Sequence, residues 1–346
     1  MTQTTLASTA RPPLSTKVIV TRTVGGTILA LAAIWLIANA IAGPTQFFSA
    51  AVAGLNNGAL YALIALGYTM VYGIIQLINF AHGDLFMLGT LFSAFLITTV
   101  FGQTAPGAVA WVVFAVTLLA TMAFCGTVNV AIEFLAYRRL RRAPRLAPLI
   151  TAVGMSFVLQ QIGVVWNGSQ PKQWPSVLPR GGFAIGGVEI AYKFLIVIAL
   201  VVPLLLVMRW LVANTKPGKA MRATSQDQDA TRLMGIDVNS TISFTFLLGG
   251  ALAGAAGVLY QQTIASTRYD LGFQLGLIAF TAAVLGGIGN LTGAVLGGVL
   301  IGLIQGINDG APYGLGQKWS QSVVFSILIL LMVFRPNGLL GRPTGE

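Results

Sequence analysis

The sequence has few charged side chains, one histidine and one cysteine. Charged residues make up 8% of its 346 residues and hydrophobic residues 55%, whereas ordinary soluble domains are about 25% charged. A soluble fold of this length could not hide that much apolar surface, so the composition excludes a soluble globular protein. A lone histidine and a lone cysteine, Cys125, also exclude an intrachain disulfide and a metal site built from those residues.

A nucleotide-binding loop is also missing. The run Pro217-Gly218-Lys219-Ala220 has a Gly-Lys pair, but it lacks the upstream glycine and the following Ser or Thr. Energy for active transport would therefore come from a partner protein or an ion gradient. The net charge of +11 does not indicate nucleic acid, because the basic residues lie in short segments between apolar runs, with no interleaved aromatics. That distribution is typical of membrane topology signals.

Many apolar runs reach the roughly 20 residues needed to cross a ~30 Å hydrocarbon core. We predict an all-α integral membrane protein in a lipid bilayer, a polytopic bundle of about eight to ten transmembrane helices with interrupted helices. The predicted spans are about 24–42, 51–73, 77–101, 108–136, 149–166, 190–211, 241–263, 273–289, 291–309 and 320–335. The runs near 273–289 and 320–335 are short enough for partial crossings, which explains the range.

The distribution of Lys and Arg predicts the orientation. With the N-terminus inside, the inner side receives all of the 20 basic residues except Lys172, Arg180, Lys193, Arg268 and Lys318. Since cytoplasmic loops carry the excess of basic residues, both termini are predicted to be cytoplasmic. The basic start, the apolar stretch 24–37 and Ala38-Asn39-Ala40 also resemble a cleavable signal peptide. Cleavage would leave the mature N-terminus outside.

A polar segment set inside apolar sequence is the first candidate functional site. It runs from Ile78 to Asp84 and contains Asn79 and His82. Ionisable residues at membrane depth normally face protein or a water-filled cavity and mark transport pathways. A capping role for Asn79 and Asp84 at a helix start, and a packing role for His82, are the structural alternatives. We predict a helix break at this segment, beside a pathway.

The long polar segment 214–240 is predicted to be cytoplasmic, and the turn-rich segment 167–188 external. In the former, Thr224 or Ser225 is predicted to cap a short helix that has Arg232 in its last turn and stops at Gly235. Such an amphipathic helix is suited to a partner's groove. Near the inner end of another span, Glu133 is predicted to form an ion pair with Arg138 and Arg139.

Two short sequence matches indicate an internal repeat. Residues 57–60 resemble 249–252, and 84–89 resemble 270–276, at a similar offset. The matched spans run in opposite directions in the predicted topology, as in the inverted repeats of transporters. Because sequence rich in Gly and Leu matches itself easily, a repeat and chance similarity both stay open.

Four longer blocks, in order, resemble the membrane permease of branched-chain amino acid importers of the ATP-binding-cassette type. They are residues 54–75 continued by 78–84, then 146–156, 218–235 and 282–290. The similarity covers about residues 50–340. We therefore expect a permease domain at 46–340, preceded at 1–45 by a tail and an extra apolar span that this family's shorter start lacks.

The resemblance implies a subunit of the H type in a bacterial plasma (inner) membrane, and not an enzyme. Two permease subunits, usually unlike relatives, would form the pathway. Two cytoplasmic ATPase subunits would bind ATP and Mg, and an external binding protein would deliver the amino acid, so this chain itself needs no cofactor or metal. Importers of urea or short amides share the block around His82, and they stay open as an alternative. An ion-gradient-driven transporter or channel is the alternative from another class.

The predicted site residues form two groups. The translocation pathway is predicted at Asn57, Tyr68, Tyr72, Asn79, His82 and Asp84. The resemblance implies that the segment 223–235 is the coupling helix that docks on an ATPase. Its coupling residues, with one just before it, would be Arg222, Ala223, Asp227, Ala230, Leu233 and Gly235.

Overall fold

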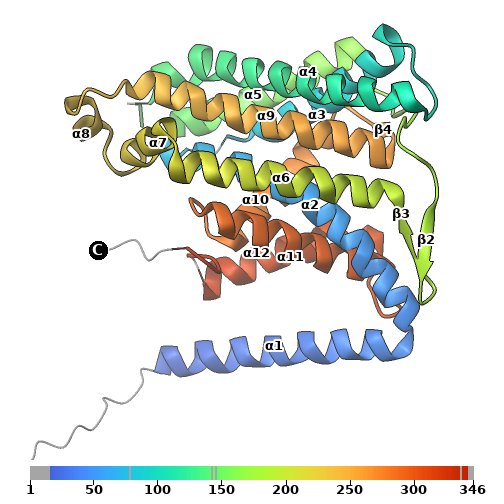
Figure 1. Ribbon diagram of the computed structural model, residues 1–346. Helices are drawn as coiled ribbons and strands as arrows, with labels where there is room; N and C mark the ends of the chain where they lie inside the picture. Colours follow the sequence, from blue (N-terminus) through green and yellow to red (C-terminus); the bar gives the residue numbers. More distant parts are fainter. Residues whose placement is uncertain (1–15, 78, 142, 145, 336, 342–346) are drawn as a thin grey trace, which may run out of the picture.

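The computed structural model describes residues 16–77, 79–141, 143–144, 146–335 and 337–341. Ile78 of the polar segment, residues 1–15 of the predicted tail and the basic residues Arg142 and Arg145 lie outside the described residues. The described residues form a bundle of roughly parallel helices (Figure 1).

Ten long helices correspond one by one to the ten predicted spans. They are α1 (Thr16–Ala42), α2 (Pro44–Ile75), α3 (Ala81–Phe95), α4 (Ala108–Ile132), α5 (Leu146–Asn167), α6 (Tyr192–Asn214), α9 (Val238–Ile264), α10 (Leu271–Gly286), α11 (Leu291–Gly310) and α12 (Ser320–Phe334). Among the described residues, nine helical segments are long and apolar enough to cross a membrane, and α10 is a shorter apolar helix. The chain is a multi-pass membrane protein, as its composition predicts.

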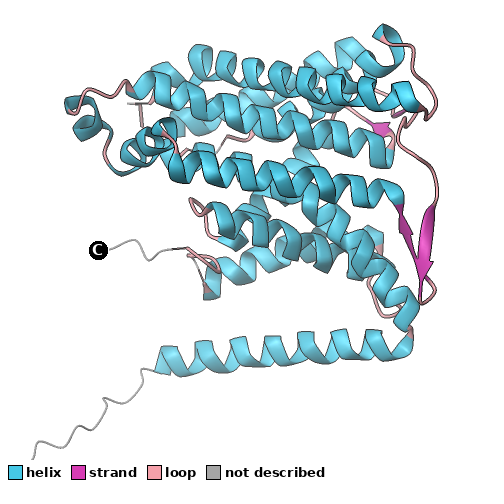
Figure 2. Ribbon diagram, in the orientation of Figure 1, coloured by secondary structure: helices cyan, strands magenta, loops and turns pink. Residues whose placement is uncertain are grey.

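Short elements occupy the two ends of the bundle (Figure 2). One end carries α7 (Lys216–Gln226) and α8 (Gln228–Leu233) and is called the α8 end. The other, the strand end, carries two small antiparallel pairs. The strand β1 (Lys172–Gln173) pairs with β4 (Ser266–Thr267), and β2 (Gly182–Ile185) pairs with β3 (Val188–Ala191). The strands β1 and β2 lie within the turn-rich segment 167–188 that is predicted to be external, β3 begins at its last residue, and β4 lies outside it.

Helix irregularities and single turns complete the structure. The π-helical turns η1 (Leu96–Val100) and η2 (Glu133–Tyr137) extend α3 and α4, and η2 continues into the 3-10 turn η3 (Arg138–Leu140). Another 3-10 turn, η4 (Gln317–Trp319), precedes α12. A π-turn widens the helix locally and frequently marks a functional position.

The centre of the bundle is α2, which packs most extensively against α11. Glycines allow the close approach, because a Cβ at Gly302 would collide with the backbone of Gly54 and Gly58, and one at Gly306 with Gly54. Without a hydrophobic force between helices in lipid, such small residues let backbones approach closely enough to gain van der Waals contact. These glycines therefore serve the packing of α2 on α11.

Packing partners are exchanged between two halves of the bundle. In the first half α2, α3 and α4 follow one another, and in the second α9, α10 and α11 do so. Helix α2 packs on α11 and α10 of the second half, while α9 packs on α4 and α3 of the first half. Helices of the two halves thus pack on one another, and the internal repeat indicated by the sequence stays a prediction.

The first helix stands apart from the rest (Figure 1). It contacts the bundle near its C-terminal end, where Trp35 Nε1 donates to the carbonyl of Tyr313 at 2.9 Å and the Tyr313 amide donates to Asn39 Oδ1 at 2.7 Å. The apolar side chains that follow Gly25 along α1 are otherwise mostly exposed.

Candidate functional site

The predicted helix break lies between α2 and α3. Helix α2 ends at Ile75, Gln76 takes a left-handed backbone with φ 52°, and α3 begins at Ala81. The His82 amide donates to the carbonyl of Asn79 at 3.1 Å. No side chain caps the start of α3, since its N-cap position is Phe80. Neither Asn79 nor Asp84 therefore caps α3 through a side-chain hydrogen bond, and that part of the capping alternative is wrong. Asp84 does lie in the first turn of α3, where the helix dipole favours an anion.

Asp84 is fully buried and tied to α5. Its Oδ2 accepts a hydrogen bond from Ser156 Oγ, and Gln160 Nε2 donates to the same Ser156 hydroxyl at 3.3 Å. The Asp84 Oδ1 has no hydrogen-bond partner among the described residues. A Cβ at Gly272 of α10 would collide with Asp84, so α3, α5 and α10 converge on this carboxylate.

His82 is fully buried at the centre of the bundle, and its ring nitrogens have no hydrogen-bond partner among the described residues. Its ring lies edge-on to the ring of Tyr68, with centroids 4.7 Å apart, and fills the space that a side chain at Gly67 would need. His82 and Asp84 are therefore enclosed by protein in this conformation.

Asn79 of the break and two tyrosines of α2 line a cavity. Asn79, Tyr68 and Tyr72 border a small cavity of about 10 Å³ beside Phe280 of α10. Thr69 and Ile288 also line it, and both also line a much larger cleft of about 650 Å³. Figure 1 shows the helix ends and turns that border the cleft gathered near the α8 end. Its walls come from the C-terminal parts of α2 and α6, from α7 and from the start of α11.

Asn57 lies away from this group. It is half-buried on α2, three turns of helix before Tyr68 and roughly 16 Å along the axis at 1.5 Å per residue. The structure thus brings together Tyr68, Tyr72 and Asn79 around one cavity, and it places Asn57 toward the strand end.

The strand end is closed over α9 by the segment after β1. Gln262 Oε1 accepts from the Val177 amide at 2.8 Å, and Ser176 Oγ donates to the Gln262 carbonyl at 2.9 Å. The Gln261 amide group donates to the carbonyl of Pro175 at 3.3 Å. These bonds hold the segment across the end of α9. The bundle is therefore covered at the strand end, whereas the large cleft lies near the α8 end.

The predicted coupling segment forms two helices, where one was expected. Thr215 caps α7 by accepting from the Gly218 amide, and Asp227 caps α8 by accepting from the Asp229 and Ala230 amides at 2.8 and 3.0 Å. The prediction of Thr224 or Ser225 as the cap is wrong. Pro217 near the start of α7 fits an earlier helix start, because proline suits the first turn.

The remaining predicted coupling residues are spread over both helices. Arg222 of α7 donates to the carbonyls of Val212 and Ala213 and so ties α7 to the end of α6. Ala223, also in α7, is half-buried. In α8, Ala230 is exposed and Leu233 is 89% exposed, and Gly235 follows with φ +81° and ends the turn as predicted.

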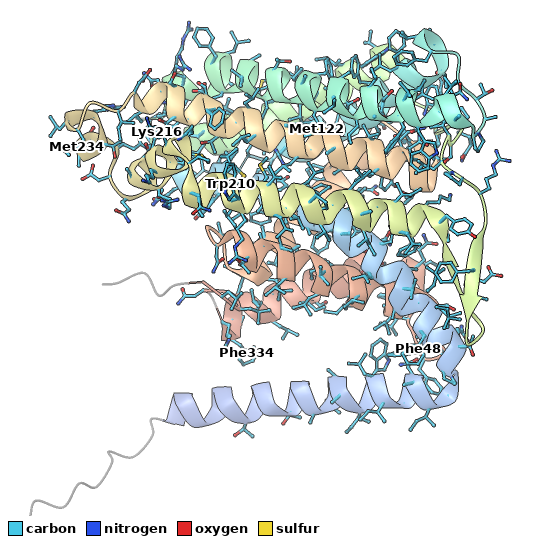
Figure 3. The ribbon with its side chains drawn as sticks, in the orientation of Figure 1. Phe48, Met122, Trp210, Lys216, Met234 and Phe334 are labelled. Atoms are coloured by element: carbon cyan, nitrogen blue, oxygen red, sulfur yellow. The ribbon has the colours of Figure 1, made fainter. Side chains whose placement is uncertain are left out.

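An apolar tip projects from the α8 end. Met234, 81% exposed, marks this tip in Figure 3, beyond Lys216 at the start of α7. An isolated Leu or Met on a surface needs no explanation, but Leu233 and Met234 are adjacent and almost fully exposed on a short capped helix. This shape is suited to insertion into a partner's groove.

A buried ion cluster lies at the same end. The Glu133 carboxylate accepts from Arg138 Nη2 at 2.9 Å, from Arg141 and from Ser243 Oγ of α9 at 2.7 Å. The predicted pair with Arg138 is confirmed, while Arg141 takes the place expected for Arg139. Burial lowers the pKa of the Arg141 guanidinium, and the nearby Glu133 opposes that shift. Ser156, Ser243 and Arg141 were not predicted, since their contacts depend on which helices pack together.

Comparison with known proteins gives a consistent answer. Residues 50–333 match the family model described as the permease component of the branched-chain amino acid transport system. The chain is 40% identical over 302 residues to the high-affinity branched-chain amino acid transport system permease protein BraD of Pseudomonas aeruginosa, covering 85% of this chain and 96% of that one.

Two further relatives agree. The permease protein LivH of Escherichia coli is 34% identical over 298 residues, covering 85% of this chain and 95% of that one. A probable permease LivH of Methanocaldococcus jannaschii is 27% identical, covering 82% and 89%. No solved structure matches the chain. With the family model matched over most of its length, the chain belongs to the family of permease components of branched-chain amino acid transport systems, which are transport proteins and not enzymes.

Proposed function

We propose that this chain is one of two permease subunits of an ATP-driven importer of branched-chain amino acids. The observation that carries the proposal is the 40% identity over 96% of the Pseudomonas permease BraD, together with the full set of predicted spans. The second permease subunit would be a relative of this chain, and a soluble external protein would deliver the amino acid. The assembly would lie in a bacterial inner membrane.

The orientation follows from the basic residues. Arg138, Arg141 and Arg222 lie at the α8 end, whereas Lys172 and Arg180 lie at the strand end. Because the side richer in Lys and Arg is normally cytoplasmic, the α8 end faces the cytoplasm and the strand end faces outward. Both the start of α1 and the C-terminal segment after α12 then lie on the cytoplasmic side.

Helix α8 is the docking element for a cytoplasmic ATPase. Its exposed Leu233 and Met234 supply the apolar contact, and Ala230 allows a close approach. ATP and Mg would be bound by the two ATPase subunits, since this sequence has no nucleotide-binding loop. Movement of the ATPases would shift α7 and α8 and so change the cleft that α7 borders.

The cleft is the cytoplasmic exit of the pathway in an inward-facing state. It shares Thr69 and Ile288 with the small cavity beside Tyr68, Tyr72 and Asn79. Asp84 and His82 do not line the cavity, because both are enclosed by protein, and they support the residues that do. Asp84 holds α3 against α5 through Ser156, and His82 holds Tyr68 in place.

Isolation of the assembly and a competition assay test the proposal. A tag on this chain should co-purify two ATPase subunits and a second permease from native membranes. Uptake of labelled leucine by the purified assembly should be reduced by excess isoleucine or valine and not by urea. Competition by urea alone would replace the amino acid by a short amide as the substrate. Recovery of this chain without any ATPase would contradict the proposal.

A further inference from the structure

One turn of π-helix joins the two functional regions of the chain. In η2, Glu133 and Tyr137 are four residues apart and both are buried, at 0% and 1% exposure. Residues at this spacing lie on the same face of a helix, one above the other. This face of η2 therefore carries a carboxylate at one position and a phenol at the next.

The carboxylate is bonded to the first turns of α9. Glu133 Oε2 accepts from Ser243 Oγ at 2.7 Å, and Arg138, which also holds Glu133, donates to the same hydroxyl at 2.7 Å. Arg141 donates to Glu133 and, at 2.8 Å, to Asn239 Oδ1. Asn239 and Ser243 follow α8 directly in the chain, because α9 begins at Val238. The start of α9, close to α8 in the chain, is therefore linked to Glu133 by these hydrogen bonds.

The phenol is bonded to the α2–α3 break. Tyr137 Oη donates to Asn79 Oδ1 at 2.8 Å, and the Asn79 carbonyl accepts from the His82 amide in the first turn of α3. Asn79 itself borders the small cavity with Tyr68 and Tyr72. The Gln76 amide closes α2 on the carbonyl of Tyr72, and Asn79 lies beyond that bond and before the start of α3, so it belongs to neither helix.

We propose that η2 transmits movement between the ATPase-docking segment and the pathway, with Tyr137 and Glu133 as positioning residues; this inference rests on the proposed function. The chain of contacts runs from α8 through the start of α9 to Glu133, across η2 to Tyr137, and from there to Asn79. Hydrogen bonds and an ion cluster join α9 to Glu133, and one hydrogen bond joins Tyr137 to Asn79, whereas the chain itself joins α8 to α9 and Glu133 to Tyr137. The two polar steps can therefore each be removed by a single substitution. π-helical turns occur frequently at functional sites, which fits a role for η2 beyond helix packing.

The test measures leucine transported per ATP hydrolysed by the whole importer in vesicles. Tyr137→Phe removes one hydroxyl and should lower this ratio about fivefold or more, while ATP hydrolysis stays within about twofold of wild type. Tyr61→Phe is the matched control. Tyr61 is also buried, but it donates to Gln305 of α11 at 2.8 Å and its hydrogen bond reaches neither the start of α9 nor the break, so the ratio should not change.

A second pair of variants tests the other end of η2. Ser243→Ala should lower the same ratio, and Ser243→Thr, which keeps the hydroxyl, should restore it. If Tyr137→Phe fails to assemble with the ATPases, the two Ser243 variants still test whether η2 transmits movement. A wild-type ratio in Tyr137→Phe or in Ser243→Ala, or an equal loss of transport and hydrolysis, would overturn the inference. Failure of the wild-type assembly to transport leucine would instead overturn the proposed function.

Discussion

Gln76 and Ala265 end α2 and α9 with nearly the same left-handed backbone, at φ 52° and φ 57°. Among the described residues, they are the two non-glycine residues with positive φ. Each amide donates to a carbonyl four residues back, to Tyr72 at 2.8 Å and to Gln261 at 2.9 Å. The same unfavourable conformation thus occurs at equivalent places in the two halves, where the chain turns into α3 and into α10.

The first prediction concerns this conformation. Because a left-handed backbone costs a non-glycine residue roughly 1–2 kcal/mol, Ala265→Gly should raise the free energy of unfolding by about 0.5–1 kcal/mol. Thermal unfolding in detergent measures the change. Ala251→Gly, in the middle of α9, is the control and should lose about 1 kcal/mol. Equal destabilisation by both variants would contradict the assigned conformation.

The second prediction concerns the contact between α2 and α11. Gly302→Ala would place a methyl group into the backbone of Gly58 and should cost about 1–3 kcal/mol. Gly154→Ala is the control, because a Cβ there meets nothing within 4 Å. The yield of folded protein and its unfolding temperature report both variants. A stable Gly302→Ala protein would mean that the two helices lie further apart.

The third prediction concerns Asp84. Asp84→Ala should lower leucine uptake about tenfold or more, because it releases Ser156 and leaves α3 untied from α5. His82→Gln should be milder, since a neutral side chain of similar length retains part of the packing on Tyr68. Uptake across a range of pH separates the roles. Full loss in His82→Gln, with disappearance of a pH dependence, would indicate a proton relay and count against packing.

The fourth prediction concerns orientation. Cysteines placed at Gln173 in β1 and at Asp229 in α8 should label from opposite sides of the membrane in cells that express this chain alone. Gln173→Cys should react with an impermeant reagent in intact cells, and Asp229→Cys only after permeabilisation. The native Cys125 is buried and should contribute little background. Reversed labelling would invert the topology.

The fold was largely predictable, because hydropathy and helix length depend on local sequence. All ten predicted spans are helices, and a break lies just before His82, between Ile75 and Ala81. Gly83 and Asp84, which were expected within the break, belong to the first turn of α3. The coupling segment was only partly predictable. Arg232 and Gly235 were placed correctly at the end of α8, but Thr215 and Asp227 compete successfully with Thr224 and Ser225 as caps.

The contacts of the site were not predictable from one sequence. Ser156 reaches Asp84, and Ser243 reaches Glu133, only because α5 packs on α3 and α9 packs on α4. Nothing local distinguishes these serines from others in apolar helices. The pairing of Glu133 with Arg141 depends on the turn η3, which carries the chain back over the helix end.

The most direct test of the central claim is leucine uptake by vesicles that contain this chain, its paired permease and both ATPases. We predict uptake only with ATP at the α8 side and the loaded binding protein at the strand side. Ala230→Arg in α8 should abolish uptake while the permeases stay folded in the membrane. Uptake driven by a proton or sodium gradient without ATP, and unaffected by Ala230→Arg, would contradict the account.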